Sequence, residues 1–239
     1  MSSSRLPGKV LKTLCNGKTL IEILILRIQE LRKQNIEIIV ATSNDESDNI
    51  LVDFLTNNFH WLKIFRGDLK NVMQRYYDAA LSYEVEVIIR ITSDCPFIDP
   101  KVISKMLNVF EDSNLDYLAN TMPPEKSTFS DGFDVEIFRR DSLQKQMNLP
   151  ELSVKDKEHV TFLFWNSLHF NIGQFKNTES PNFQFKLSVD NNDDFLMIDS
   201  IVKRIGYYNS YSEIEYFIEA NEDIRNLNIN SKKNSGWKV

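Results

Sequence analysis

The sequence predicts an α/β fold built on a mostly parallel sheet. Short apolar runs that suit buried strands alternate with segments whose apolar residues recur at helical spacing, which is the pattern of βαβ units. The 239 residues are 42% hydrophobic and 26% charged, as in a globular protein with a substantial core. We therefore expect one domain over residues 1–222, followed by a polar tail over residues 223–239.

The alternation can be followed along the chain. Helices are predicted at 20–31, 48–59, 72–83 and 99–110, and buried strands at 36–41, 62–65 and 87–91. Asp99 and Pro100 are typical of a helix N-cap and first turn. The pattern loosens after residue 116, where we expect an antiparallel or edge element. Further strands are predicted at 117–119, 133–138, 170–175 and 183–187, and further helices at 155–168, 193–205 and 212–220.

Charge and composition narrow the classes of partner. The net charge is −6 and basic residues cluster only briefly, so an extended nucleic-acid surface is not expected. The two cysteines lack the spacing of a zinc site or a disulfide framework. No apolar run approaches the ~20 residues that span a bilayer. We expect a cytoplasmic protein with a small anionic ligand, and neither nucleic acid nor membrane as a partner.

The N-terminal segment is a candidate phosphate loop. Small residues leave backbone N–H groups free to face phosphate oxygens, and two cations lie four positions apart. The candidate ligands of a triphosphate are Ser3, Ser4, Arg5 and Lys9. A disordered basic N-terminus is the alternative interpretation of this segment.

Two carboxylates are candidates for a magnesium site. Asp94 directly follows the strand predicted at 87–91, and ligands of open α/β sheets bind outside the carboxyl ends of strands. Asp190 follows another apolar-leaning segment, and Mg²⁺ bound to a nucleotide takes one or two protein carboxylates. The alternative for Asp94 is a loop carboxylate that caps the next helix. Asp193 and Asp194 belong to the same acidic cluster but stand at a predicted helix start, where the helix dipole favours carboxylates, so a structural role is preferred for them over a metal-binding one.

Two further side chains have two interpretations each. Arg75 either reaches the ligand or pairs with surface acids. His159 either contacts the acceptor substrate, as a ligand or as a base, or is a helix histidine that is held only by packing.

Five motifs in order carry a resemblance to a known family. They are Ser-Ser-Arg-Leu-Pro-Gly-Lys at 3–9, Ala-Thr-Ser at 41–43 with Asp48, Arg-Ile-Thr-Ser-Asp-Cys-Pro at 90–96, Asp-Gly-Phe-Asp-Val-Glu at 131–136, and Glu-His-Val-Thr at 158–161. Together they resemble the cytidylyltransferases, and within them the spore coat polysaccharide biosynthesis protein F group. The chain is more distantly similar to the enzymes that make CMP-Kdo and CMP-sialic acid.

The resemblance implies a Rossmann-like three-layer sandwich of the nucleotide-diphospho-sugar transferase type. It implies CTP above the strand ends, with Arg5 and Lys9 on the triphosphate and Mg²⁺ on Asp94 and Asp190. Near the nucleotide it places Thr42, Ser43 and Asp48. In the half that faces an acceptor sugar it places Asp131, Asp134, Glu136, Glu158 and His159. The implied activity is transfer of CMP to a sugar for polysaccharide or glycan biosynthesis, and relatives in the wider family often form homodimers.

One departure from the family concerns the first strand. Relatives begin with a strand before the phosphate loop, and here Met1 coincides with the residue that follows it, so this central strand is expected to be missing. A start codon assigned too late and a natural truncation both remain open. The alternatives to a cytidylyltransferase are a nucleotide-sugar-dependent glycosyltransferase, whose Asp-x-Asp motif the chain lacks at Asp94, and a truncated non-catalytic nucleotide-binding protein.

Overall fold

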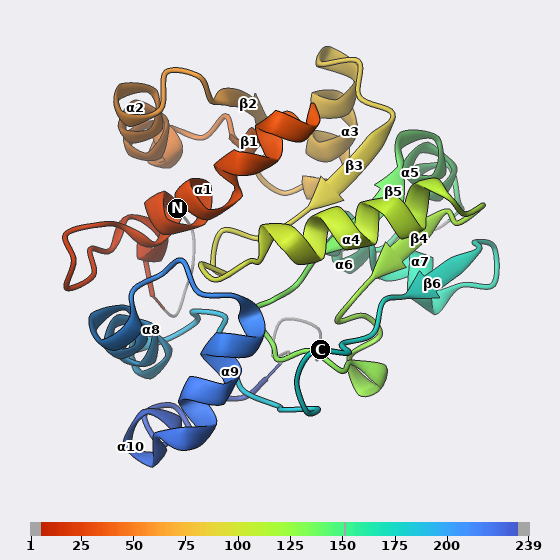
Figure 1. The fold of residues 1–239 in the computed structure, drawn as a ribbon. Helices are drawn as coiled ribbons and strands as arrows, with labels where there is room; N and C mark the ends of the chain where they lie inside the picture. Colours follow the sequence, from red (N-terminus) through yellow and green to blue (C-terminus); the bar gives the residue numbers. More distant parts are fainter. Residues whose placement is uncertain (1–5, 151, 234–239) are drawn as a thin grey trace.

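The computed structural model describes residues 6–150 and 152–233, and its strands form two sheets (Figure 1). In the smaller sheet, β1 (Ile39–Ser43) pairs in parallel with β2 (Lys63–Gly67). The larger sheet has the order β3-β5-β4-β6. Its strands are β3 (Val87–Arg90), β4 (Tyr117–Ala119), β5 (Glu136–Arg139) and β6 (Ile172–Gln174). β5 runs antiparallel to both of its neighbours, as expected after residue 116, whereas β4 and β6 are parallel.

Helices cover the sheets on both faces, which gives three layers (Figure 1). One layer contains α1 (Leu20–Ile28) and α4 (Pro100–Glu111), and beside it lie α2 (Asn49–Asn58), α8 (Asn192–Ile205), α9 (Tyr211–Ala220) and α10 (Glu222–Arg225). The other contains α3 (Val72–Ser82), α5 (Arg140–Met147), α6 (Val154–His159) and α7 (Phe162–Asn166). This is the predicted α/β sandwich.

The alternation of side chains along the strands divides the core between the two faces. On β5, Ile137 belongs to the cluster under α1 and α4, whereas Phe138 belongs to the cluster under α3 and α5. On β4, Leu118 and Tyr117 divide in the same way. Because successive strand side chains point to opposite faces, β4 and β5 each supply both cores.

Local signals set the helix boundaries. The Asp99 carboxylate accepts a 2.8 Å hydrogen bond from the backbone N–H of Lys101, and Pro100 begins α4, so the predicted cap is confirmed. Asn191 and Asp194 form a reciprocal capping box at the start of α8. Asp194 thus has the helix-terminal role that its sequence position predicts.

Two predicted elements are corrected, and one helix was not predicted. The helix expected at 155–168 is two helices, α6 and α7, because Val160 takes φ 61° and ψ −56° between them. The strand expected at 183–187 forms only an isolated bridge, between Lys186 and Asp131. The helix α5 was not expected, since its residues are mostly polar and only a narrow face with Leu143 is buried.

Within the described residues, no strand lies between β1 and β3, and the two sheets are therefore separate. The described part of the predicted tail packs on the domain: Ile224 is buried, and Asn228 donates to the Asp194 carboxylate at 3.0 Å. No helix among the residues described is long and apolar enough to cross a membrane.

Candidate functional site

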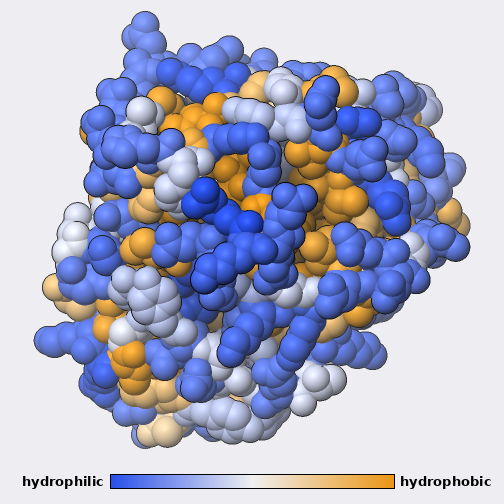
Figure 2. Space-filling model, turned by 45° about the horizontal axis from the view of Figure 1, so that its top comes forward, coloured by the Kyte–Doolittle hydropathy of each residue, from blue (hydrophilic) through white to orange (hydrophobic). Residues whose placement is uncertain are grey.

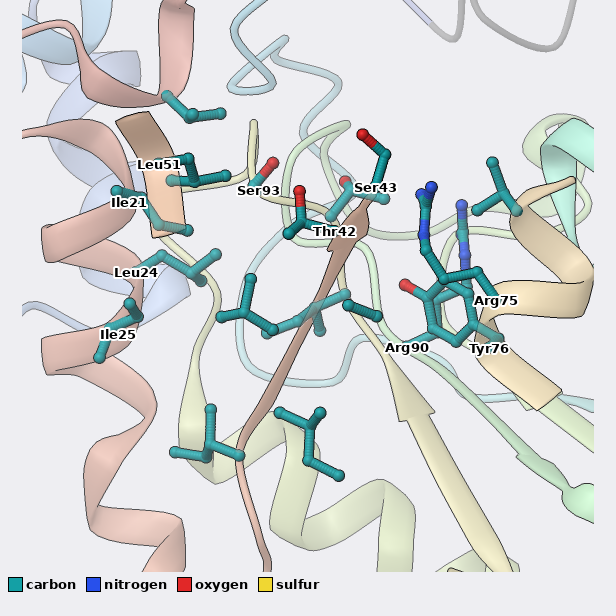
Figure 3. Close-up of a pocket in the computed structure, with 18 of the residues that line it drawn as sticks. Ile21, Leu24, Ile25, Thr42, Ser43, Leu51, Arg75, Tyr76, Arg90 and Ser93 are labelled. Carbon is teal, nitrogen blue, oxygen red and sulfur yellow. The ribbon is translucent and has the colours of Figure 1, made fainter. Parts of the chain in front are cut away.

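A cleft of about 680 Å³ lies between β1 and β3. Figure 2 shows its mouth as an apolar hollow bordered by hydrophilic residues. The close-up places Thr42, Ser43 and Ser93 at one end of the cleft, where β1 and β3 terminate, and Ile21, Leu24 and Ile25 of α1 along a wall (Figure 3). The cleft is thus polar at the carboxyl ends of the strands and apolar toward their amino ends.

At the polar end, Lys9 joins two predicted site carboxylates. Its ammonium group lies 2.8 Å from Asp94 Oδ2 and 3.4 Å from Asp190 Oδ1, and it donates to the Val189 carbonyl at 2.6 Å. Burial works to raise the pKa of Asp94, but the charge and hydrogen bond of Lys9 outweigh it, so the pKa is lowered. Asp94 is therefore ionised at neutral pH. The turn before Lys9 needs Gly8, whose φ is 68°.

A second lysine, Lys186, contacts this cluster through Asp190 and was not predicted as a site residue. The side chain of Lys186 is 3% exposed and lies 3.0 Å from Asp190 Oδ2 and 3.1 Å from Asp194 Oδ2. It also donates to the carbonyl and the hydroxyl of Ser188, at 2.7 and 2.9 Å. Burial works to lower the pKa of Lys186, but Asp131, Asp190 and Asp194 outweigh burial and raise it. Asp190 thus lies between two ammonium groups.

The predicted residues at the end of β1 form one hydrogen-bonded unit. The hydroxyls of Thr42 and Ser43 each donate to Asp48 Oδ2 at 2.6 Å, and the Ser43 N–H donates to the same oxygen at 3.0 Å. Burial works to raise the pKa of Asp48, but the hydrogen bonds that its carboxylate accepts, these among them, lower it. The unit fixes the loop that follows β1 beside the mouth of the cleft.

Two arginines share one wall of the cleft (Figure 3). Arg75 donates to the Asp68 carbonyl at 2.7 Å, and its stem packs against Gly67, where an added Cβ would lie only 2.9 Å from Arg75 Cγ. Burial lowers the pKa of Arg75. The Nε of Arg75 and the Nε of Arg90 are buried and have no acceptor among the residues that the structure describes. Arg75 thus lies in the cleft wall, and its contact with a ligand stays a prediction.

Glu136 is held in a buried network. Its carboxylate accepts hydrogen bonds from Tyr117 at 2.6 Å and Thr161 at 2.5 Å, and it is paired with Arg90. Burial works to lower the pKa of Arg90, but Glu136 outweighs it and raises the pKa. Contact between Glu136 and a substrate would require this network to open.

The other predicted acceptor residues flank the cluster. Asp134 accepts hydrogen bonds from Thr121 at 2.7 Å and from the Gly132 N–H at 2.6 Å, while burial and the charge of Asp131 raise its pKa to about 7. The backbone of Asp131 forms an isolated parallel β-bridge with that of Lys186. Glycine is required at 132, where φ is 108° and a Cβ would lie 2.4 Å from the Leu187 carbonyl carbon.

Glu158 lines the cleft, whereas its neighbour His159 is half-buried at the end of α6. Burial lowers the pKa of His159, so its imidazole is mostly neutral at pH 7. Ser3, Ser4 and Arg5 lie outside the described residues. Neither Lys186 nor Arg90 was predicted as a site residue, although a lysine inside the apolar-leaning segment 185–189 was a signal for the first.

Comparison with known proteins decides the family. The sequence model of the cytidylyltransferases matches residues 1–225. The chain belongs to the cytidylyltransferase family. It is 28% identical to the spore coat polysaccharide biosynthesis protein SpsF of Bacillus subtilis, over 86% of this chain and 84% of that protein. As a cytidylyltransferase it is an enzyme that transfers a nucleotidyl group.

Solved structures support the same assignment. A cytidylyltransferase from Leptospira borgpetersenii is 26% identical and superposes with a TM-score of 0.85, over 94% of this chain and 92% of that one. The structure of CMP:2-keto-3-deoxy-manno-octonic acid synthetase complexed with CTP is 19% identical, with a TM-score of 0.61 over 84% of this chain and 94% of that one. The second likeness shows the fold, which is the predicted nucleotide-diphospho-sugar transferase type.

The carboxylates fit a nucleotide-bound magnesium ion. Among the described residues, no group of three or more His, Cys, Asp or Glu side chains is placed to hold a metal ion by itself. Mg²⁺ in nucleotide sites takes one or two carboxylates and completes its shell with phosphate oxygens and water. Asp94 and Asp190 supply such a pair, and both already face one cation, the Lys9 ammonium group.

Proposed function

We propose that this cytidylyltransferase transfers CMP from CTP to a hydroxyl of a sugar and releases pyrophosphate, which yields a CMP-sugar for polysaccharide or glycan biosynthesis. The observation that carries the proposal is the meeting of Lys9, Asp94 and Asp190 at the polar end of the cleft. Cations and a paired carboxylate site are what a triphosphate with its metal requires. The relationship to SpsF supports the polysaccharide context.

In the proposed reaction the sugar hydroxyl oxygen attacks the α-phosphorus of CTP and gives up its proton to solvent water. A new O–P bond forms, the bond between the α-phosphorus and the bridging oxygen breaks, and pyrophosphate leaves with that bond's electrons. Asp94 and Asp190 would hold Mg²⁺, which when bound supplies charge neutralisation at the phosphates. Lys9 stabilises the triphosphate and the leaving pyrophosphate, together with Arg5. Positioning and charge carry such a transfer, so no nucleophilic side chain is needed.

The remaining predicted residues surround this centre. Thr42, Ser43, Asp48 and Arg75 border the nucleotide half of the cleft. The acceptor sugar would lie toward Asp131, Asp134 and Glu158. Glu136 and His159 would lie behind these three side chains, further from the sugar. Cys95 is buried, and burial raises its pKa well above the usual value, so its thiol takes no part as a nucleophile.

The experiment that tests the proposal follows pyrophosphate release from CTP with Mg²⁺ and a panel of sugars. ATP, GTP and UTP serve as matched nucleotides, and the Asp94→Asn variant as the inactive control. Sugar-dependent release that requires CTP, with a CMP-sugar identified by mass, is the expected result. CTP binding without release with any sugar would favour the non-catalytic alternative, and consumption of a supplied nucleotide-sugar would favour the glycosyltransferase.

Two further proposals concern the state of the protein in the cell. A homodimer is proposed from the wider family, and light scattering of the purified chain measures it. A cytoplasmic location is proposed from the composition, and fractionation of cells that express the protein tests it.

A further inference from the structure

The chain that follows helix α10 returns to the carboxylate cluster. α10 contacts α8 and α9, and Ile224 and Leu227 pack against the core cluster under α1 and α4. The backbone then turns, and the Ser231 N–H donates to the Asn228 carbonyl at 2.8 Å. This turn brings Asn228 to the start of α8, where it contacts Asp194, a residue 34 positions earlier in the chain.

Asn228 joins the two residues that flank Asp190 in the chain. Its side-chain nitrogen donates to Asp194 Oδ1 at 3.0 Å and to the Lys186 carbonyl at 2.9 Å. A side-chain amide has two N–H donors, so both of them are used here. Asn228 is only 6% exposed, and water therefore cannot easily replace these bonds when they are lost.

Asp194 holds the backbone of Asp190. Its Oδ2 atom accepts hydrogen bonds from the N–H of Asp190 at 3.0 Å and from the N–H of Asn191 at 3.2 Å. The capping box of α8 requires only the bond to Asn191, which is the N-cap residue. The bond to the Asp190 N–H is additional, and it fixes the residue that precedes the cap.

Lys186 holds the side chain of Asp190. The Lys186 ammonium group donates to Asp190 Oδ2 at 3.0 Å, and Oδ1 of the same carboxylate faces the ammonium group of Lys9 at 3.4 Å. Asp190 is thus fixed at its backbone by Asp194 and at its carboxylate by Lys186. Because Asn228 bonds to both of these residues, it contacts both supports of Asp190.

A further contact holds the turn 228–231 against α8. The side-chain nitrogen of Asn191 donates to Ser231 Oγ at 3.0 Å. Attachment of the segment to the domain is already provided by the apolar contacts of Ile224 and Leu227. The polar contacts of the turn, in contrast, converge on the residues around Asp190, which indicates a role at that carboxylate in addition to packing.

We infer that the turn 228–231 belongs to the proposed magnesium site and that Asn228 is a positioning residue, which acts on Asp190 through Asp194 and Lys186. The inference rests on the proposed role of Asp190 in holding Mg²⁺. Partners that orient a metal-binding carboxylate govern the affinity for the metal, because they fix the direction of its oxygens before the ion arrives. The segment predicted as a polar tail thus completes the site.

The test compares Asn228→Ala, which removes both donors, with Asn228→Asp, which keeps the shape but turns an oxygen toward Asp194. Asn230→Ala is the matched control, since Asn230 is an exposed asparagine of the same turn. Ile218→Val, a core change in α9, controls for a general loss of stability. Calorimetric titration measures the affinity for CTP with Mg²⁺ and with EDTA, and backbone NMR measures amide hydrogen exchange at Asp190.

We expect Asn228→Ala to reduce the gain in CTP affinity that Mg²⁺ provides by about 3- to 10-fold, at the lower end of the effects of outer partners on metal affinity. Asn228→Asp should reduce it at least as much. The affinity in EDTA should stay unchanged, and exchange at the Asp190 amide should become faster. Neither Asn230→Ala nor Ile218→Val should change these quantities.

Three outcomes would overturn the inference. The first is an unchanged magnesium gain in Asn228→Ala, and the second is unchanged exchange at the Asp190 amide. The third is an equal loss of the gain in Ile218→Val, because stability alone would then explain the effect. Wild-type protein whose affinity for CTP does not depend on Mg²⁺ would instead contradict the proposed magnesium site itself, and the inference with it.

Discussion

Lys186 offers the sharpest test of how the site is held together. The change Lys186→Met keeps most of the side-chain length and removes the charge. It leaves Asp194, which is 1% exposed, and Asp190 without the ammonium group that lies 3.1 and 3.0 Å from them. The contacts of Asp194 with the start of α8 and with Asn228 remain, so the fold has a framework in which the loss can be measured.

Removal of one partner from a buried ion pair costs about 3–5 kcal/mol, because the other charge is left buried and uncompensated. For a chain of this length, each kcal/mol corresponds to about 2–4 °C in Tm. We therefore expect Lys186→Met to lower Tm by roughly 10 °C and the urea midpoint in proportion.

Lys63→Met is the matched control. Lys63 forms a 2.6 Å ion pair with Glu37, but the two side chains are 40% and 51% exposed. An exposed pair of this kind contributes about 0–1 kcal/mol. Urea unfolding followed by tryptophan fluorescence compares the two variants. A loss of stability in Lys186→Met no larger than that in Lys63→Met would refute the assignment of Lys186 as the cation that compensates the buried carboxylates.

Three further predictions concern the site. Lys9→Ala should weaken CTP binding about 10- to 100-fold, as expected for a lost charge-assisted contact of about 1.5–3 kcal/mol. The control Lys12→Ala removes a surface hydrogen bond to Asn192 and should leave CTP binding unchanged. Calorimetric titration compares the two variants, and equal affinities for CTP would exclude Lys9 from the phosphate site. Asp94→Asn should abolish turnover and the magnesium dependence of CTP binding, and the double change with Asp190→Asn should add little further loss if both carboxylates hold one ion. Burial and the charge of Asp131 raise the pKa of Asp134 from 3.8 to about 7, so the folded protein binds the proton of this carboxyl group more tightly than the unfolded chain does. The contribution of Asp134 to stability is therefore lost as the pH rises toward and through 7. Asp134→Asn should flatten the Tm profile between about pH 4 and 7, and an unchanged slope would contradict this assignment.

Most of the architecture could be predicted from local pattern. Asp99 and Pro100 mark the start of α4, and the strand at 117–119 has the predicted bounds, because caps and apolar runs act through neighbouring residues. The helix break at Val160 could not be predicted, since its positive φ is imposed by the surrounding packing. The polar helix α5 was missed because its residues are mostly polar, and the narrow face that it buries against α3 and β5 is not evident from the sequence pattern.

The sequence by itself determined the family, the α/β class and the motifs that carry Lys9, Asp94 and Asp190. Only the tertiary structure decided which of these side chains meet. The carboxylates are 96 positions apart in the chain, yet Lys9 contacts both because strand ends and loops converge at one end of the cleft. Burial likewise decided that the Glu136 carboxylate is held in a hydrogen-bonded network and that Lys186 forms ion pairs below the site. The type of a residue determines the charge of its side chain, but only the fold determines which partners that side chain meets.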